Sequence, residues 1–197
     1  MKPFRLPEPL IASSLALLVV VFGFTQPVRT QTMGQPEEFT AGAIDINHGR
    51  TGQIQISVKR WSTPAERETL VAVLLQKGPD GLLKSLQDMK PVGTIRTPDT
   101  LGYDLHYAAE RPGVDGGRDV VFATDRPVSF WEAVNRPRLS NYPFTLIQIH
   151  MNPDGKGEGK LAVAAKITAD QDSKTIEIEN FQMQPVTLVN VTSQKKH

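Results

Sequence analysis

The feature that most constrains the fold of this chain is a series of short segments in which apolar and polar residues alternate. Ile54, Ile56 and Val58 alternate with polar residues, directly after the turn-forming stretch 47–52 (NHGRTG). Successive side chains of a β-strand point to opposite faces, so this alternation predicts strands with one buried face. The expected strands are 43–46, 54–58, 94–96, 103–107, 119–122, 144–152, 160–168, 174–181 and 186–191.

The turns between these segments are close together, which predicts sequential hairpins and an antiparallel meander that forms a sandwich or a barrel. One inserted stretch has helical spacing instead. Thr63 and Glu66 form a capping box around a proline at the first helical position. Gly78 and Pro79 are expected to end this helix, and a second helix is expected over about 80–89. The predicted fold class is therefore mainly β (α+β), with one inserted helical hairpin.

The N-terminal residues indicate export. Basic residues Lys2 and Arg5 precede an apolar run from Leu10 to Phe24, as in a secretory signal peptide. The run is shorter than the ~20 residues that usually span a bilayer. No Ala-x-Ala cleavage motif lies near its end, so an uncleaved anchor through residues 10–24 is the alternative.

The expected organisation is a signal peptide or N-terminal anchor over 1–31, a polar leader over 32–40 and a single β-rich domain over 41–197. Such a domain lies outside the cytoplasm, in the periplasm or the extracellular space. It touches a membrane only through its N-terminal segment, and only if that segment is uncleaved.

The composition excludes several kinds of chemistry. The chain has no cysteine, so it has no disulfide, thiol nucleophile, cysteine-ligated zinc or iron–sulfur cluster. Its 22 basic and 21 acidic residues nearly balance, which argues against nucleic acid as a partner because that binding rests on clustered Lys and Arg. No cofactor is expected.

Two motifs that suggest ligand chemistry are better explained as ordinary structure. The glycine-rich stretch 155–160 (GKGEGK) is followed by a strand, whereas a phosphate-binding loop leads into a helix, so a hairpin tip is expected there. Glu177 and Glu179 lie on one face of a strand opposite Ile176 and Ile178. We interpret the two carboxylates as a solvated face and the isoleucines as the core face.

The histidines offer the best candidates for catalysis. His106 and His150 lie in expected strands, and Asp104 shares a strand face with His106. If those strands were neighbours, the three side chains would assemble a metal site or a general base held by a carboxylate. No His-x-His or His-Glu-x-x-His spacing supports this geometry. Ordinary strand residues are the favoured reading, so no catalytic or metal residue is assigned.

An aromatic and basic segment offers the best candidate for ligand binding. It places Arg126, Phe130 and Trp131 in a connection between strands, and with Tyr103 these are the predicted ligand-binding residues. A guanidinium and aromatic rings of this kind can line the mouth of a barrel. The alternative is that Phe130 and Trp131 cover one end of the core while Arg126 pairs with a nearby carboxylate.

Several stretches also support a resemblance. They are 60–63 (RWST), 95–98 (IRTP), 101–105 (LGYDL), 124–127 (TDRP), 130–133 (FWEA) and 155–160 (GKGEGK). In these the chain resembles a set of uncharacterised exported bacterial proteins of unknown function. The resemblance spans most of the mature chain and implies one intact domain. No activity is assigned to that group, so no site is transferred.

Two functional hypotheses follow. The first is an exported, non-enzymatic β-rich module that binds a small or apolar ligand or a partner in the cell envelope. The second is an uncharacterised hydrolase-like or metal-dependent enzyme that uses Asp104, His106 or His150.

Overall fold

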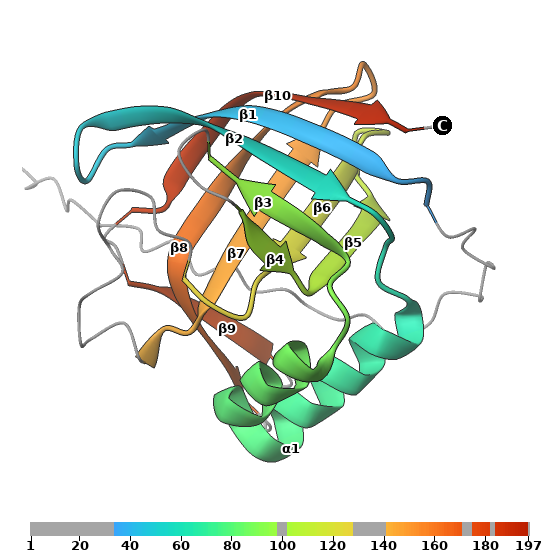
Figure 1. Ribbon diagram of the computed structural model, residues 1–197, viewed down its shortest axis with the longest axis vertical. Coiled ribbons are helices and arrows are strands. Elements are labelled where there is room, and N and C mark those ends of the chain that lie inside the picture. Colours follow the sequence, from blue (N-terminus) through green and yellow to red (C-terminus); the bar gives the residue numbers. More distant parts are fainter. Residues whose placement is uncertain (1–33, 98–101, 128–140, 171–174, 182–183, 197) are drawn as a thin grey trace, which may run out of the picture.

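The protein is described by a computed structural model over residues 34–97, 102–127, 141–170, 175–181 and 184–196. In these ranges one 10-stranded antiparallel sheet curls into a nearly closed barrel, with a single helix packed against it (Figure 1). The elements are β1 (Glu37–Asp45), β2 (Arg50–Val58), α1 (Pro64–Asp88), β3 (Gly93–Arg96), β4 (Tyr103–Leu105), β5 (Tyr107–Pro112), β6 (Arg118–Ala123), β7 (Phe144–Met151), β8 (Lys156–Asp170), β9 (Thr175–Asn180) and β10 (Val186–Lys195). The expected mainly β (α+β) fold is confirmed, and the sheet has the shape of a barrel.

The order of strands around the barrel is β4-β3-β2-β1-β10-β8-β7-β6-β5, and β9 pairs with the C-terminal part of β8. The two end strands, β4 and β5, are consecutive in the chain and separated only by His106. Ser62 bridges part of the gap. Its backbone N–H donates to the Ala108 carbonyl at 2.8 Å, and its side-chain Oγ accepts from the Ala108 N–H at 3.1 Å.

The interior of the barrel is filled by its own side chains. Phe39, Trp61 and Phe122 pack together with ring centroids 5.4–6.4 Å apart, and each is at most 5% exposed. Aliphatic residues from the other strands complete this core. Alternating side chains put these residues inside the barrel and leave their sequence neighbours on its outer surface.

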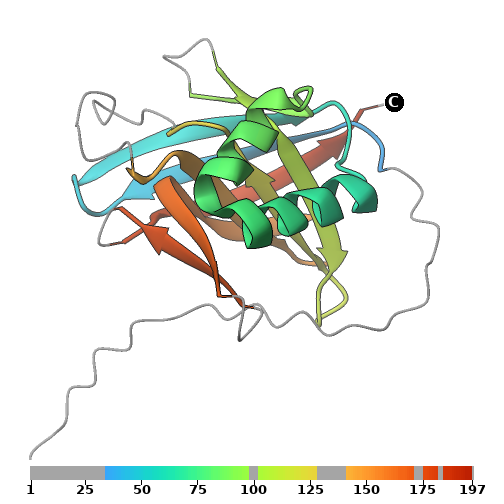
Figure 2. The same cartoon turned by 90° about the horizontal axis from the view of Figure 1, so that it is seen from below.

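Helix α1 packs on the outside of the barrel, across its wall (Figure 2). The predicted capping box is present: the Glu66 N–H donates to Thr63 Oγ1 at 3.1 Å, and the Thr63 N–H donates to Glu66 Oε2 at 2.8 Å. Gly78 has a φ of 68°, and Pro79 follows it. The expected break at Gly78 and Pro79 is therefore present: α1 consists of two helical segments that meet at a kink at Gly78. Its buried leucines cover the outer surface of β7 and β8; they are Leu70, Leu74, Leu82 and Leu86.

Two predicted boundaries are corrected. The domain begins with β1 at Glu37, so residues 37–40 belong to the sheet and not to a polar leader. The stretch expected as a hairpin tip, 155–160, is mostly strand, because β8 begins at Lys156. Glycine allows this close pairing: a Cβ at Gly157 would lie 2.3 Å from the His150 carbonyl oxygen, and one at Gly159 would lie 2.4 Å from that of Gln148.

The interpretation of strand β9 is correct in part. Glu177 and Glu179 are exposed as expected, and Ile176 packs against the cluster under α1. Ile178 is 41% exposed, so it is not a core residue. The reason is that β9 pairs only with β8 and lies beside the barrel rather than in its wall.

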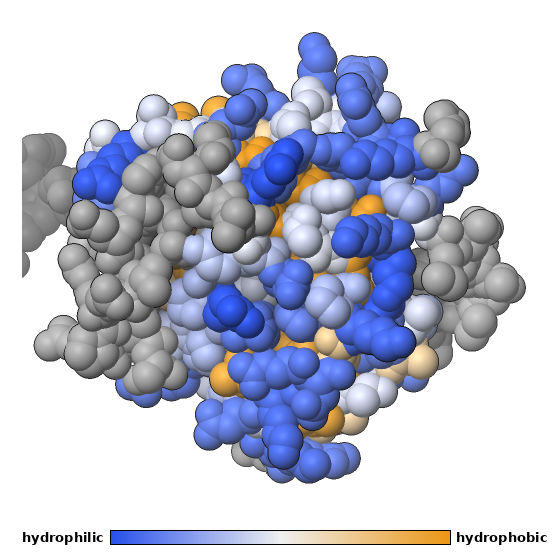
Figure 3. All heavy atoms as spheres, viewed as in Figure 1, coloured by the Kyte–Doolittle hydropathy of each residue, from blue (hydrophilic) through white to orange (hydrophobic). Residues whose placement is uncertain are grey.

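The surface of the barrel is mostly polar. On the side that carries β2 and β3, hydrophilic residues dominate and apolar surface is limited to small patches (Figure 3). Among the described residues, no helix combines the length and the apolar character needed to cross a bilayer. The predicted signal segment, 1–31, lies outside the described residues.

Candidate functional site

An open groove lies on the outside of the barrel, where it is bounded by α1 and by the wall that β5, β6, β7 and β8 form. Its volume is about 1840 Å³. We call it the outer groove. Its floor consists of two rows of outward-facing side chains that cross β5, β6, β7 and β8 in register. The charged row is Arg111, Asp119, His150 and Glu158, and the mixed row is Ala109, Val121, Gln148 and Lys160. Between the mixed row and α1 lie Tyr107, Ala123 and Leu146.

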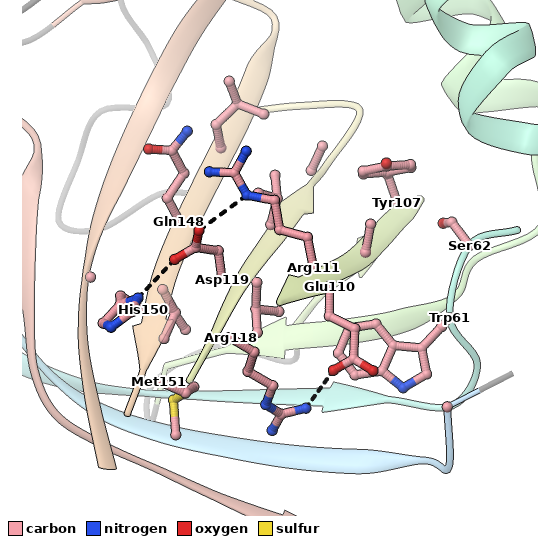
Figure 4. Close-up of a pocket in the computed structure, with 18 of the residues that line it drawn as sticks. Trp61, Ser62, Tyr107, Glu110, Arg111, Arg118, Asp119, Gln148, His150 and Met151 are labelled. Carbon is pink, nitrogen blue, oxygen red and sulfur yellow. Dashed lines mark hydrogen bonds and ion pairs between the residues drawn. The ribbon is translucent and has the colours of Figure 1, made fainter. Parts of the chain in front are cut away.

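The charged row is held together by hydrogen bonds between neighbouring strands (Figure 4). Arg111 Nε donates to Asp119 Oδ2 at 3.1 Å, and His150 Nδ1 lies 2.8 Å from Asp119 Oδ1. The second ring nitrogen, His150 Nε2, lies 3.0 Å from Oδ2 of Asp115 in the turn between β5 and β6. The same turn is closed by the Gly117 N–H, which donates to Asp115 Oδ1 at 3.0 Å. These contacts fasten the turn to β7.

The electrostatics of this row favour a charged histidine. The hydrogen bonds to Asp119 and then to Asp115 raise the pKa of His150 above its ordinary value. The bond to His150, together with Arg111, lowers the pKa of Asp119, and the bond from the Gly117 N–H is the largest cause lowering that of Asp115. Both imidazole nitrogens therefore act as donors to carboxylates. A histidine held in this way has no free nitrogen to act as a general base.

Other polar groups of the floor are available to a ligand. Within the described part of the chain, the side chains of Gln148, Glu158 and Lys160 have no hydrogen-bond or ion-pair partner. Gln148 is half-buried, whereas Glu158 and Lys160 are exposed on β8. The small side chains of Ala109 and Val121 lie beside them on β5 and β6. The floor thus combines free donors and acceptors with a shallow apolar strip.

An ion-pair network closes the barrel at the end of the groove. Arg118, which points inward from β6, donates from Nη1 to Glu37 Oε2 at 2.9 Å and to Glu110 Oε2 at 2.6 Å. Its Nη2 also bonds Glu37, and the guanidinium lies 5.6 Å from the centroid of the Phe39 ring. The bonds to Glu37 are the main cause that raises the pKa of Arg118. Trp61 lies next to this network, at the edge of the groove (Figure 4).

The residues predicted from the sequence lie elsewhere. Tyr103 begins β4 and Arg126 follows the end of β6, and neither residue lines the outer groove. Asp125 is the main cause that raises the pKa of Arg126, because its carboxylate accepts from Arg126 Nε at 3.0 Å and from Nη2 at 3.2 Å. The alternative in which Arg126 pairs with a nearby carboxylate is therefore confirmed. Phe130 and Trp131 lie outside the described residues.

The two histidines do not meet. His106 is buried between β4 and β5, where Nδ1 donates to the Met89 carbonyl at 3.1 Å and Nε2 lies 3.6 Å from Asp125 Oδ1. His150 lies on the outer surface of β7, which β6 separates from β5. Asp104 is exposed while His106 is buried, so the two do not share a face, because the strand ends at Leu105. The grouping that was considered only on the condition that their strands were neighbours is therefore not present, and the shared face expected for Asp104 and His106 is wrong. No cluster of metal-ligating side chains occurs among the described residues.

Comparisons with known proteins give no match to a family model, a curated protein or a solved structure. The function is therefore inferred from the geometry of the groove. Sequence reasoning missed most of the outer groove, namely Arg111, Asp115, Asp119, Gln148 and Lys160. For those that lie in strands the alternation that marks an outward-facing side chain was visible, but the register that aligns them across the sheet was not.

Proposed function

We propose that this protein is an exported, non-enzymatic binding module, and that its partner is an elongated component of the cell envelope that lies in the outer groove. The observation that carries the proposal is the floor formed by the charged and mixed rows, with free polar groups on Gln148, Glu158 and Lys160. A groove of about 1840 Å³ is larger than the ~300–1,000 Å³ of ordinary small-molecule pockets. An elongated partner makes better use of it.

The filled barrel interior supports the same reading. Residues such as Phe122, Ile147 and Leu161 are 0% exposed inside the barrel. A small apolar ligand held inside, as in a lipocalin, would have to displace them. The filled interior therefore favours a partner on the outer surface.

The environment of His106 argues against catalysis at the other candidate site. Its Nδ1 donates to the Met89 carbonyl, its Nε2 faces the Asp125 carboxylate at 3.6 Å, and the side chain is only 7% exposed. A general base needs a nitrogen within reach of a substrate proton, and this burial keeps a substrate away from Nε2. The enzyme hypothesis therefore has less support than the binding hypothesis.

The test is groove-dependent binding to envelope material. The purified protein is mixed with washed bacterial envelopes, and the bound fraction is measured by co-sedimentation. Val121→Trp fills the floor of the groove and is expected to abolish most binding. Thr94→Trp, at an outward position of β3 away from the groove, is the matched control and should bind like the parent. Equal binding by both variants, or none by the parent, would contradict the proposal. Export is checked separately by locating the protein in fractionated cells.

A further inference from the structure

We infer that the ligand of the outer groove is an uncharged glycan chain that crosses β5, β6, β7 and β8 along the two rows. This inference rests on the proposed binding function and names the ligand class for the same site.

Charge complementarity is the first argument. In the charged row, Arg111 and the His150 imidazolium are neutralised by Asp119 and Asp115. At the end of the groove, Glu37 and Glu110 likewise neutralise Arg118. The remaining floor charges, Glu158 and Lys160, are of opposite sign and lie on the same strand. The charges of the floor are therefore nearly balanced, while Arg67 of α1 and Lys195 of β10 also line the groove, so the floor suits a polar ligand without strong charge.

The types of polar group are the second argument. Gln148 offers an amide that both donates and accepts, Lys160 donates and Glu158 accepts. Arg111 uses Nε for Asp119, and its terminal nitrogens remain as further donors. A sugar hydroxyl both donates and accepts, so a chain of sugars can satisfy every one of these groups.

The spacing of the rows is the third argument. Neighbouring strands lie about 4.8 Å apart, so a chain that crosses them meets one side chain of each row at every step of that length. This step is close to the length of one hexose unit in an extended glycan. Ala109 and Val121 in the mixed row leave room for the C–H face of a sugar ring, and the half-buried ring of Tyr107 flanks them.

An extended peptide fits less well. Peptides bind sheets chiefly by adding a strand to an open edge, where backbone groups are free. The floor of the outer groove is a sheet face, and the strands below it are paired with each other from Arg111 through Gln148 to Lys160. A lipid is disfavoured too, because the charged row would remain in contact with its apolar chain.

The experiment is calorimetric titration of the purified protein with uncharged hexasaccharides. The probes are β-1,4-linked glucose, β-1,4-linked N-acetylglucosamine, β-1,3-linked glucose and α-1,4-linked glucose. At least one is expected to bind with a Kd on the order of 1 mM or tighter, and its disaccharide should bind more weakly because it spans fewer strands. Gln148→Ala removes a group with no protein partner, so it should raise the Kd about tenfold without changing the melting temperature. Gln87→Ala, on the exposed face of α1, is the matched control and should leave the Kd unchanged.

The outcomes separate this inference from the proposed function. If no hexasaccharide binds at about 10 mM while envelope binding still depends on the groove, the glycan is wrong and the binding module stands. The same conclusion follows if only charged polysaccharides or peptides bind. If neither glycan nor envelope binding depends on the groove, both proposals fail. Glycan binding that Gln148→Ala leaves unchanged would place the site elsewhere and overturn the inference.

Discussion

The ion pair between Glu37 and Arg118 should be a main support of the barrel end. The Glu37 side chain is 2% exposed and that of Arg118 is 23% exposed, and the two are joined by both terminal nitrogens of the guanidinium. Arg118→Met keeps an apolar stem over Phe39 but leaves the Glu37 carboxylate buried without its counter-ion. Breaking a buried pair from one side costs about 3–5 kcal/mol, and the partial exposure of Arg118 favours the lower value. We therefore expect the free energy of unfolding to fall by about 3 kcal/mol.

A double-mutant cycle isolates the pair. Glu37→Gln alone should cost less than Arg118→Met, because the arginine can still pair with Glu110 and reach water. Combining the two removes both charges, so the double variant should be more stable than the sum of the single losses predicts, by about 1–3 kcal/mol. The assay is urea unfolding followed by circular dichroism. In a thermal scan, a loss of 3 kcal/mol in a domain of this size corresponds to about 6–12 °C.

The cycle also defines the result that would refute the reasoning. If the losses in the free energy of unfolding of the two single variants add without a coupling energy, the Glu37–Arg118 pair contributes nothing to stability. Packing alone would then hold the barrel end. A control cycle uses Arg111 and Asp119, an exposed pair on the same sheet. Its coupling energy should be at most about 1 kcal/mol.

Three further outcomes are expected. Phe122→Ala removes a ring that is 0% exposed and packed against Phe39 and Trp61, so unfolding by urea should show a loss of about 3–5 kcal/mol. Gly78→Ala forces a side chain into the glycine-only conformation at φ 68° and ψ −165° and should cost about 1–3 kcal/mol in the same assay, although a Cβ there meets no neighbour. His150 has a raised pKa in the folded state, so its contribution is complete below the unfolded value of 6.5 and disappears as the pH rises through the folded value. The difference in melting temperature between the parent and His150→Gln should therefore be larger at pH 6 than at high pH, and an equal difference at both would contradict the contacts with Asp115 and Asp119.

What the sequence could predict depended on how far apart the interacting residues lie. The capping box of Thr63 and Glu66 is contained in one helical turn, so its pattern is complete in the sequence and the structure confirms it. Glu37, by contrast, looks like part of a polar leader, because the Arg118 that justifies burying it lies 81 residues away. The alternation in 103–107 was equally misleading. It continues through His106, whereas in the structure β4 ends before this residue and β5 begins after it. On one side the Leu105 carbonyl accepts from the Val92 N–H, and on the other the Ala108 carbonyl accepts from the Ser62 N–H.

The candidate site shows the same limit. Arg111 and Asp119 are 8 residues apart in one hairpin, whereas Asp119 and His150 are 31 residues apart and meet only because β6 pairs with β7 in one register. A shift of one residue would turn His150 into the barrel. The sequence therefore marked His150 as a residue of interest but gave it the wrong neighbours. Tyr103 and Arg126, two of the predicted ligand-binding residues, do not line the groove.

The charged row and the barrel-end pair should differ in what they contribute. Arg111 and His150 are exposed, and ion pairs of that kind add little to the free energy of unfolding. What their contacts do provide is position, since they hold the turn between β5 and β6 against β7 through Asp115. Stability and binding should therefore respond to different residues. Changes at Glu37 or Arg118 should lower the melting temperature, whereas a change at Gln148 should weaken binding alone. If the charged and mixed rows served only to keep the protein soluble, a change at Gln148 would affect neither binding nor the melting temperature.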